Sequence, residues 1–150
     1  VAFGEALKPE FKDYIKQVKV NAKILSEVLM KNGIDIVTKG TDSHMVLVDL
    51  RSKNVTGKDA EESLERAGMT CNKNGVSNDP NPPTITSGIR LGSPAATTRG
   101  FKEKEFEFIG ESISTVINTL SSSNSDIEML ENSIKKEVYD LCQRFPIYKN

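Results

Sequence analysis

Hydrophobic residues recur every three or four positions from residue 9 to residue 31, the spacing that lines one face of an α-helix. The positions on this face are Phe11, Ile15, Val18, Ala22, Leu25 and Leu29. Pro9 suits the first turn of such a helix, and Asn32-Gly33 provides a stop signal after it. The pattern predicts one amphipathic helix over residues 9–31, roughly 35 Å long at 1.5 Å per residue.

The positions after this helix follow the shorter alternation that is typical of β-strands. The predicted strands are residues 34–36, 45–50 and 69–72, followed by a short apolar segment around Ile89 and Leu91. Glycine, proline and asparagine separate these segments, as they do between the strands of a sheet. We therefore expect a small sheet.

Three more segments have helical periodicity. They are residues 56–67, residues 101–120 and residues 127–141. Thr56 is placed to cap the first of them, with Asp59 at the third helical position, and residues 121–126 break the chain between the last two. Helices and strands in this order predict the α/β class, with a small mixed or antiparallel sheet packed against helices.

Composition excludes several classes of partner. The chain has 150 residues, of which 37% are hydrophobic and 27% charged, and its formal net charge is −1. This balance argues against broad electrostatic binding to nucleic acid or to an anionic membrane. No apolar run approaches the ~20 residues that span a bilayer. We expect neither nucleic acid nor a membrane as a partner.

The cysteines indicate the redox compartment of the protein, and the first residues indicate how the chain begins. Cys71 and Cys142 belong to no C-x-x-C pattern, and the chain has one histidine, which argues against a structural zinc site. Reduced thiols in a cytoplasmic protein are the expected state. The opening VAFGEALKPEF lacks an initiator Met and already has helical rhythm, so we expect the chain to be cut from a longer protein.

Arg90 stands between Ile89 and Leu91, inside the short apolar strand. A buried guanidinium is costly unless an anion meets it. The residues are compatible with two partners, an acidic side chain of the protein or the carboxylate of a ligand, which a guanidinium can bind through paired hydrogen bonds. Arg99, at the start of the following helix, is expected to be structural.

Residues 73–84, KNGVSNDPNPPT, form the longest turn-rich segment of the chain. Lys73 and the side-chain amides of Asn72 and Asn74 lie at its start. An amide presents a donor and an acceptor together, which suits the edge of a heterocycle. Composition leaves a structural turn and a ligand-binding loop both open.

Three segments together resemble serine hydroxymethyltransferase, namely GTDSHMVLVDL, NKNGVSNDPNPPTITSGIRLGSPAATTRGF and LCQRFPIY. The resemblance extends over nearly the whole chain in matching order. It implies a homodimeric fold-type-I enzyme dependent on pyridoxal phosphate (PLP), which converts serine and tetrahydrofolate to glycine and methylenetetrahydrofolate. Residues 1–33 would then be a long helix connecting from a large domain, and residues 34–150 the small C-terminal domain.

The resemblance also implies roles for particular residues. Arg90 matches the arginine that binds the α-carboxylate of the amino-acid substrate. The positions that match folate contacts are Asn74, Pro82, Pro83 and Thr84, with Lys73 as a further and less direct candidate. The family commonly has an aromatic residue where this chain has Thr84, which weakens that one assignment.

The resemblance places the Schiff-base lysine of the family upstream of this chain, so no catalytic residue is assigned and the 150 residues alone are predicted to be inactive. Two other classes stay open. One is the C-terminal domain of another fold-type-I PLP enzyme, such as an aminotransferase. The other is a non-catalytic binding or assembly domain, in which the apolar stripe from Phe11 to Leu29 is exposed and favours self-association.

Overall fold

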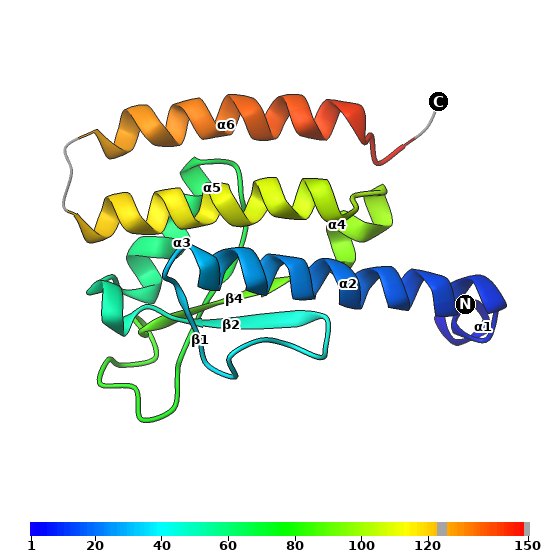
Figure 1. Cartoon of the computed structure of the whole chain (residues 1–150), viewed down its shortest axis with the longest axis horizontal. Coiled ribbons are helices and arrows are strands. Elements are labelled where there is room, and N and C mark those ends of the chain that lie inside the picture. Colours follow the sequence, from blue (N-terminus) through cyan, green and yellow to red (C-terminus); the bar gives the residue numbers. More distant parts are fainter. Residues whose placement is uncertain (123–125, 149–150) are drawn as a thin grey trace.

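The computed structural model describes residues 1–122 and 126–148, and within them four strands form one antiparallel sheet. The strands are β1 (Asp35–Ile36), β2 (Met45–Asp49), β3 (Asn72–Asn74) and β4 (Gly88–Gly92), arranged in the order β1-β2-β4-β3. Helices cover one face of this sheet, whereas loops of the described residues border the other (Figure 1). The predicted α/β class, a small antiparallel sheet packed against helices, is confirmed.

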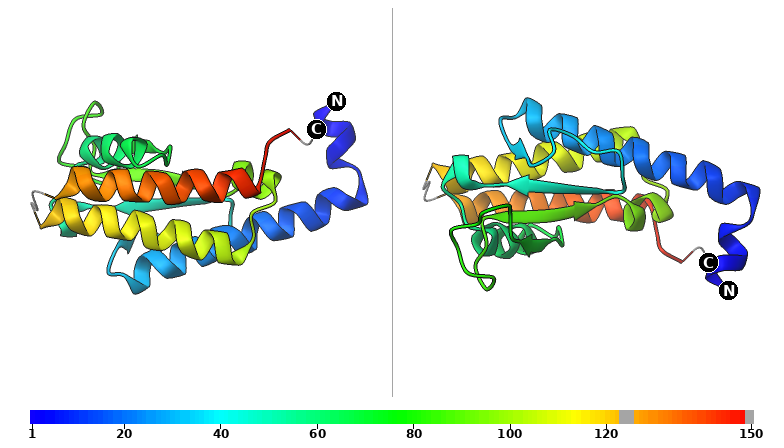
Figure 2. Two further views of the ribbon diagram at one scale, coloured as in Figure 1. Left: turned by 90° about the horizontal axis from the view of Figure 1, so that it is seen from above. Right: turned by 90° about the horizontal axis from the view of Figure 1, so that it is seen from below.

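The helices lie in layers above the sheet. They are α1 (Ala2–Ala6), α2 (Pro9–Lys31), α3 (Gly57–Arg66), α4 (Pro94–Arg99), α5 (Glu103–Ser121) and α6 (Ile127–Arg144), with a 3-10 turn η1 (Arg51–Lys53). α2 packs on β1, β2 and α5, while α3 packs on β3 and β4. α6 runs beside α5 and forms the outermost layer (Figures 1 and 2). The long helix predicted over residues 9–31 is confirmed as α2.

Two further local predictions concern helix ends. The side chain of Thr56 accepts a hydrogen bond of 3.1 Å from the backbone N–H of Asp59, so the predicted cap of α3 is confirmed. The predicted break between the last two helices, residues 121–126, includes residues 123–125, which lie outside the described residues.

Two boundaries differ from the predictions because backbone hydrogen bonds extend helix ends. The N–H of Met69 still bonds the carbonyl of Leu64 (2.8 Å) at the end of α3, so β3 begins at Asn72 rather than at residue 69. The hydrophobic pattern misses the short helix α4. Its closing bond runs from the N–H of Phe101 to the carbonyl of Ala96 (3.0 Å), which moves the start of the next helix from residue 101 to Glu103.

Alternation along the paired strands creates one buried and one open face of the sheet. Val46 and Val48 of β2 lie opposite Leu91 and Ile89 of β4, and these side chains are at most 7% exposed. Arg90 is turned to the other face, because successive side chains of a strand alternate. The strand around Ile89 is therefore buried on one side only, and the expectation of a buried guanidinium is wrong for this chain.

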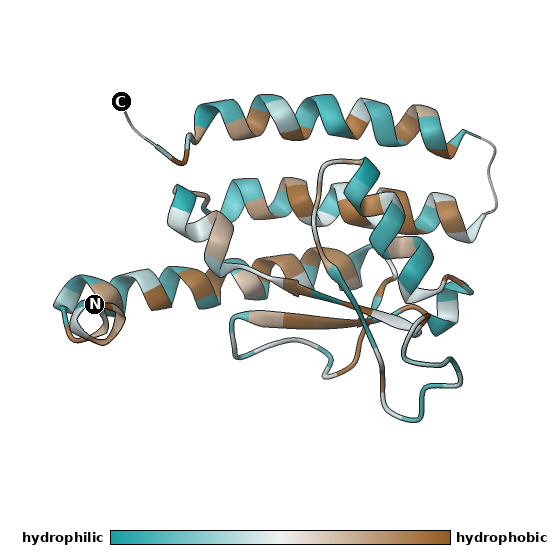
Figure 3. Cartoon of the chain, turned by 180° about the vertical axis from the view of Figure 1, so that it is seen from behind, coloured by the Kyte–Doolittle hydropathy of each residue, from teal (hydrophilic) through white to brown (hydrophobic). Residues whose placement is uncertain are grey.

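The buried face of the sheet and the apolar sides of α2, α3 and α5 share one hydrophobic core (Figure 3). Leu29 of α2 and Phe106 of α5 are at most 1% exposed. The two helices come close together at Gly110, where a side chain would collide with Val28. Burial of this kind contributes about 1.5–3 kcal/mol of transfer free energy for each large apolar side chain.

The N-terminal arm, which consists of α1 and the first turns of α2, projects beyond the rest of the chain (Figures 1 and 2). Phe3 on this arm is 89% exposed and Ile15 is 37% exposed. Leu25 and Leu29, farther along the same helix, are at most 2% exposed because they pack in the core. The expectation of an exposed stripe is therefore wrong for the C-terminal half of α2.

Polar contacts attach α6 to the layer beneath it. Glu131, which is 3% exposed, accepts hydrogen bonds from Ser63 Oγ (2.5 Å) and from Arg66 Nε (2.7 Å) on α3. Near the other end, the Arg99 guanidinium donates to the backbone carbonyls of Cys142 and Phe145 (3.0 Å each), where a cation is favourable beside the C-terminus of a helix. Arg99 is structural in this arrangement, as the sequence suggests.

Replacing Gly110 with Ala should destabilise the chain, because the new Cβ would lie 2.8 Å from Cγ1 and 2.9 Å from Cβ of Val28. The clash should lower the free energy of unfolding by about 1–3 kcal/mol, measured by urea denaturation. Gly4→Ala is the matched control, since Gly4 also lies in a helix and a Cβ there meets nothing within 4 Å. A Gly110→Ala chain as stable as the wild type would contradict this packing.

Replacing Glu131 with Gln should remove a pH-dependent part of the stability. Burial raises the pKa of this carboxyl, but hydrogen bonds from Arg66 and Ser63 outweigh burial and hold the pKa below its ordinary value of 4.5. The stabilisation is therefore present above that ordinary value and is lost as the pH falls below it. At pH 7 we expect Glu131→Gln to lower the free energy of unfolding by about 1–2 kcal/mol, because solvent screens the partly exposed Arg66.

Urea denaturation at pH 7 and at pH 3 measures this difference. Glu137→Gln is the control, because Glu137 is an exposed residue of the same helix. The difference between Glu131→Gln and the wild type should shrink at the lower pH. A difference of equal size at both pH values would show that the ion pair does not cause it.

Candidate functional site

Arg90 lies in the middle of the open face of the sheet. The register places it opposite Leu47 of β2 on one side and Asn72 of β3 on the other. Paired residues of an antiparallel sheet point to the same face, so these neighbours flank the guanidinium on the face that the helices leave uncovered. The backbone of a central strand thereby fixes the direction of the cation.

The Arg90 guanidinium has no carboxylate within ion-pair distance among residues 1–122 and 126–148; the ion pairs found there involve other cations. By contrast, Arg51 is paired with Asp49, and Arg66 with Glu131. Of the two partners that the sequence leaves open for Arg90, an acidic side chain of the protein is therefore not found in the described part of the chain.

A hollow of about 770 Å³ opens beside Arg90. Its walls come from α2, from the loop between β1 and β2 and from the open face of the sheet, with Lys23, Glu27, Thr41, Leu47 and Asn74 among the lining residues. This volume lies within the usual range for small-molecule sites, and a few polar groups on a partly apolar wall are typical of such sites.

Asn74 shares this hollow with Arg90. It ends β3 and pairs with Gly88 of β4. Its side-chain N–H donates to the carbonyl of Gly75 (2.8 Å), which holds the amide in place at the end of the strand. The structure thus brings together two of the residues that the sequence singles out.

Lys73 points away from this hollow. It pairs with Ile89, whose side chain lies on the helix-covered face, and its Nζ is 2.7 Å from Glu61 Oε2 on α3. The backbone N–H of Lys73 also donates to Glu61 Oε1 (3.1 Å), and these hydrogen bonds lower the pKa of the Glu61 carboxyl. Lys73 therefore ties β3 to α3, and the structure does not bring it together with Arg90.

Pro82, Pro83 and Thr84 are exposed on the loop between β3 and β4 and do not line the hollow around Arg90. The backbone N–H groups of Ile85 and Thr86 both donate to the carbonyl of Pro82 (2.9 Å each), so this part of the loop is a closed turn. The loop is largely hydrophilic (Figure 3). The structure thus places these three residues together on the surface.

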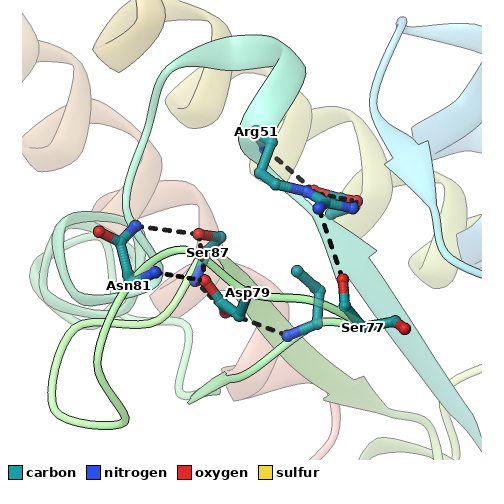
Figure 4. A network of polar contacts seen from close by, with 7 residues as sticks. Arg51, Ser77, Asp79, Asn81 and Ser87 are labelled. Atoms are coloured by element: carbon teal, nitrogen blue, oxygen red, sulfur yellow. Dashed lines mark hydrogen bonds and ion pairs between the residues drawn. The ribbon is translucent and has the colours of Figure 1, made fainter.

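Sequence reasoning did not single out Asp79, which organises this loop (Figure 4). Its Oδ2 accepts hydrogen bonds from the backbone N–H groups of Val76 (3.1 Å) and Ser87 (2.9 Å). Its Oδ1 accepts from the N–H of Asn81 (2.9 Å) and from Ser87 Oγ (2.6 Å). These bonds, the one from the Ser87 hydroxyl above all, hold the pKa of Asp79 well below its usual range. The signal in the sequence is an aspartate before a proline in a turn, a position where the side chain often binds nearby backbone N–H groups.

Arg51 holds the loop from the side of β2 (Figure 4). Its guanidinium binds Asp49 through Nε (3.0 Å) and Nη2 (2.6 Å), and its Nη1 donates to the carbonyl of Ser77 (3.4 Å). The hydrogen bonds from Arg51 lower the pKa of Asp49. The start of the loop is therefore tied to β2 as well as to Asp79.

The hollow beside Arg90 offers no lysine suited to a Schiff base with PLP. A lysine that forms a Schiff base reacts as a free amine, which proteins favour by desolvating it. The lysines that line the hollow, Lys23 and Lys39, are both exposed, and Lys23 Nζ lies 3.7 Å from Glu27 Oε1. Within the described ranges, no group of three or more His, Cys, Asp or Glu side chains could hold a metal ion.

The described helices were also compared with the length and hydrophobicity of a membrane-spanning segment. None of them is long and apolar enough to cross a bilayer.

Comparisons with known proteins agree on one family. A family model described as serine hydroxymethyltransferase matches residues 1–113. The chain is 60% identical over 149 residues to a serine hydroxymethyltransferase of Paramagnetospirillum magneticum, a match that covers 99% of this chain and 35% of that protein. It is 58% identical to the serine hydroxymethyltransferase of Rhodospirillum centenum (99% and 34% covered) and 58% identical to that of Ruegeria pomeroyi (100% and 35% covered).

The chain therefore spans about a third of the length of these relatives. The family model covers more than half of the chain, and the identities extend over nearly all of it. The chain belongs to the serine hydroxymethyltransferase family.

Proposed function

We propose that this chain is the part of a serine hydroxymethyltransferase that binds the carboxylate of the amino-acid substrate and one side of tetrahydrofolate. The complete enzyme would interconvert serine and glycine while transferring a one-carbon unit to or from tetrahydrofolate. The observation that carries the proposal is the Arg90 guanidinium, which faces a hollow and has no acidic partner among the described residues. Membership of the family supports the same assignment.

Arg90 would bind the α-carboxylate of serine or glycine. A guanidinium has paired N–H donors in a plane that matches a carboxylate, and each such charge-assisted bond contributes about 1.5–3 kcal/mol. The backbone of β4, hydrogen-bonded on both sides, would hold the arginine in one direction before the substrate arrives. This preorganisation reduces the entropy lost on binding.

Asn74 and the turn of Pro82, Pro83 and Thr84 would contact tetrahydrofolate. The side-chain oxygen of Asn74 would accept a hydrogen bond from the heterocycle, while one of its two N–H donors stays bound to the Gly75 carbonyl. The ion pair of Lys73 with Glu61 argues against a direct folate contact by Lys73. Lys73 would instead hold β3, and with it Asn74, in place against α3.

PLP, when bound, would act as an electron sink for the substrate carbanion. The residues that hold it would lie in the remainder of the enzyme, because the exposed Lys23 and Lys39 do not suit a Schiff base. We propose that this chain's own residues bind and orient the amino acid and the folate. Residues 1–33 would connect to the large domain and residues 34–150 would form the small one, in a cytoplasmic homodimer.

The two alternative classes are less well supported. An aminotransferase has no need of a folate contact, and the relatives that match this chain are serine hydroxymethyltransferases. A purely structural assembly domain would not require, beside a hollow of small-molecule size, an arginine that has no acidic partner among the described residues.

Replacing Arg90 with Lys in the full-length enzyme should raise KM for serine by about 10- to 100-fold, because lysine keeps the charge but loses the paired donors. KM for tetrahydrofolate should change little. Steady-state kinetics with each substrate varied in turn measures both constants. Arg144→Lys is the control, because Arg144 lies exposed at the end of α6. An unchanged KM for serine in the Arg90→Lys enzyme would refute the assignment.

The 150-residue chain alone should produce no glycine from serine and tetrahydrofolate, even with added PLP, because the lysines that line the hollow, Lys23 and Lys39, are exposed and do not suit a Schiff base. The assay needs a preparation free of full-length enzyme, with full-length enzyme as the positive control. Turnover by the isolated chain would show that its own residues hold the cofactor.

A further inference from the structure

One carboxylate closes the loop between β3 and β4. Val76 follows β3, and Ser87 precedes β4, and the backbone N–H groups of both donate to the same oxygen of Asp79. Asn81, midway along the loop, donates to the other oxygen. Asp79 therefore fixes the two ends of the loop and its middle relative to one another (Figure 4).

Asp79 has little capacity left for a ligand. A carboxylate has about four lone-pair sites, and Val76, Asn81 and Ser87 already direct donors at both oxygens. The Asn81 side chain adds a second tie, because its Nδ2 donates to Ser87 Oγ (2.9 Å). The carboxylate thus acts on the shape of the loop rather than on a bound molecule.

The end of the loop, where Ile85 and Thr86 lead into β4, is held in a conformation that it would not adopt alone. Thr86 has φ of 59°, which is unfavourable for a β-branched residue. The N–H groups of Gly57 and Lys58, at the start of α3, donate to the carbonyls of Thr86 and Ile85 (3.0 Å each). A Cβ on Gly57 would lie 2.3 Å from the carbonyl oxygen of Gly88, so the loop and α3 are in direct contact.

The exposed part of the loop is preorganised as a result. Pro82 and Pro83 have fixed φ angles, and the turn after them is closed onto the Pro82 carbonyl. The conformation of this turn depends on Asn81 before it and on Ser87 after it, and both are bound to Asp79.

We propose that Asp79 is a positioning residue for tetrahydrofolate: its hydrogen bonds to Val76, Asn81 and Ser87 hold the Pro82–Thr84 turn in the conformation that meets the folate. This inference rests on the proposed function. Asp79 would set the affinity for tetrahydrofolate without touching the folate. Binding of the amino acid depends instead on Arg90 and is independent of Asp79.

The test compares variants of the full-length enzyme. Asp79→Asn replaces one acceptor oxygen with an N–H₂ group that faces the N–H donors of the loop. Ser87→Ala keeps the carboxylate and removes one hydroxyl donor. Asp35→Asn, the same chemical change at an exposed position of β1, is the matched control.

We expect Asp79→Asn to raise KM for tetrahydrofolate by about tenfold, which corresponds to the loss of one charge-assisted hydrogen bond. Ser87→Ala should raise it in the same direction by about threefold. KM for serine, kcat at saturating folate and the calorimetric Kd for glycine should stay within about twofold of the wild type, because loss of uniform binding changes KM alone. Asp35→Asn should change none of these constants.

An unchanged KM for tetrahydrofolate in both loop variants would overturn the inference. So would equal losses for serine, glycine and folate, which would indicate a general structural role. If Asp79→Asn does not fold, the constants of Ser87→Ala decide between these outcomes. A wild-type enzyme that forms no glycine from serine and tetrahydrofolate would refute the proposed function itself, and the inference with it.

Discussion

The antiparallel pairing of β2 with β4, covered by helices on one face only, is the constraint on which the rest of the structure depends. Val46 and Ile89 enter the core, so strict alternation turns Leu47 and Arg90 outward. A shift of β4 by one residue in this register would bury the guanidinium and expose Ile89 and Leu91. The hydrophobic effect that assembles the core therefore also sets the direction of the cation at the site.

Several charged side chains hold elements of the fold together. Glu131 with Arg66, and Glu61 with Lys73, attach helices to one another or to the sheet, while Asp79 closes a loop. Arg90, on the open face, has no such acidic partner in the described ranges. Arg90 is exposed beside the hollow, so its guanidinium is open to an anionic ligand.

Much of the fold follows from local patterns. The helix over residues 9–31, the strand at residues 45–50 and the Thr56 cap each depend on neighbouring residues, and each is present in the structure. The hydrophobic pattern does not predict the start of β3 or the helix α4. Helix-closing hydrogen bonds at Met69 and Phe101 decide them, and hydrophobic periodicity does not register such bonds.

The sequence by itself determined the α/β class, the family and the identity of Arg90 and Asn74 as candidates, because these depend on periodicity and on motifs along the chain. Only the tertiary structure decided which candidates share a hollow. Lys73 and Asn74 are adjacent in sequence, yet they face opposite sides of the sheet, and Lys73 is paired with Glu61. The role of Asp79 likewise appears only in three dimensions, because its hydrogen-bond partners lie at both ends of a loop.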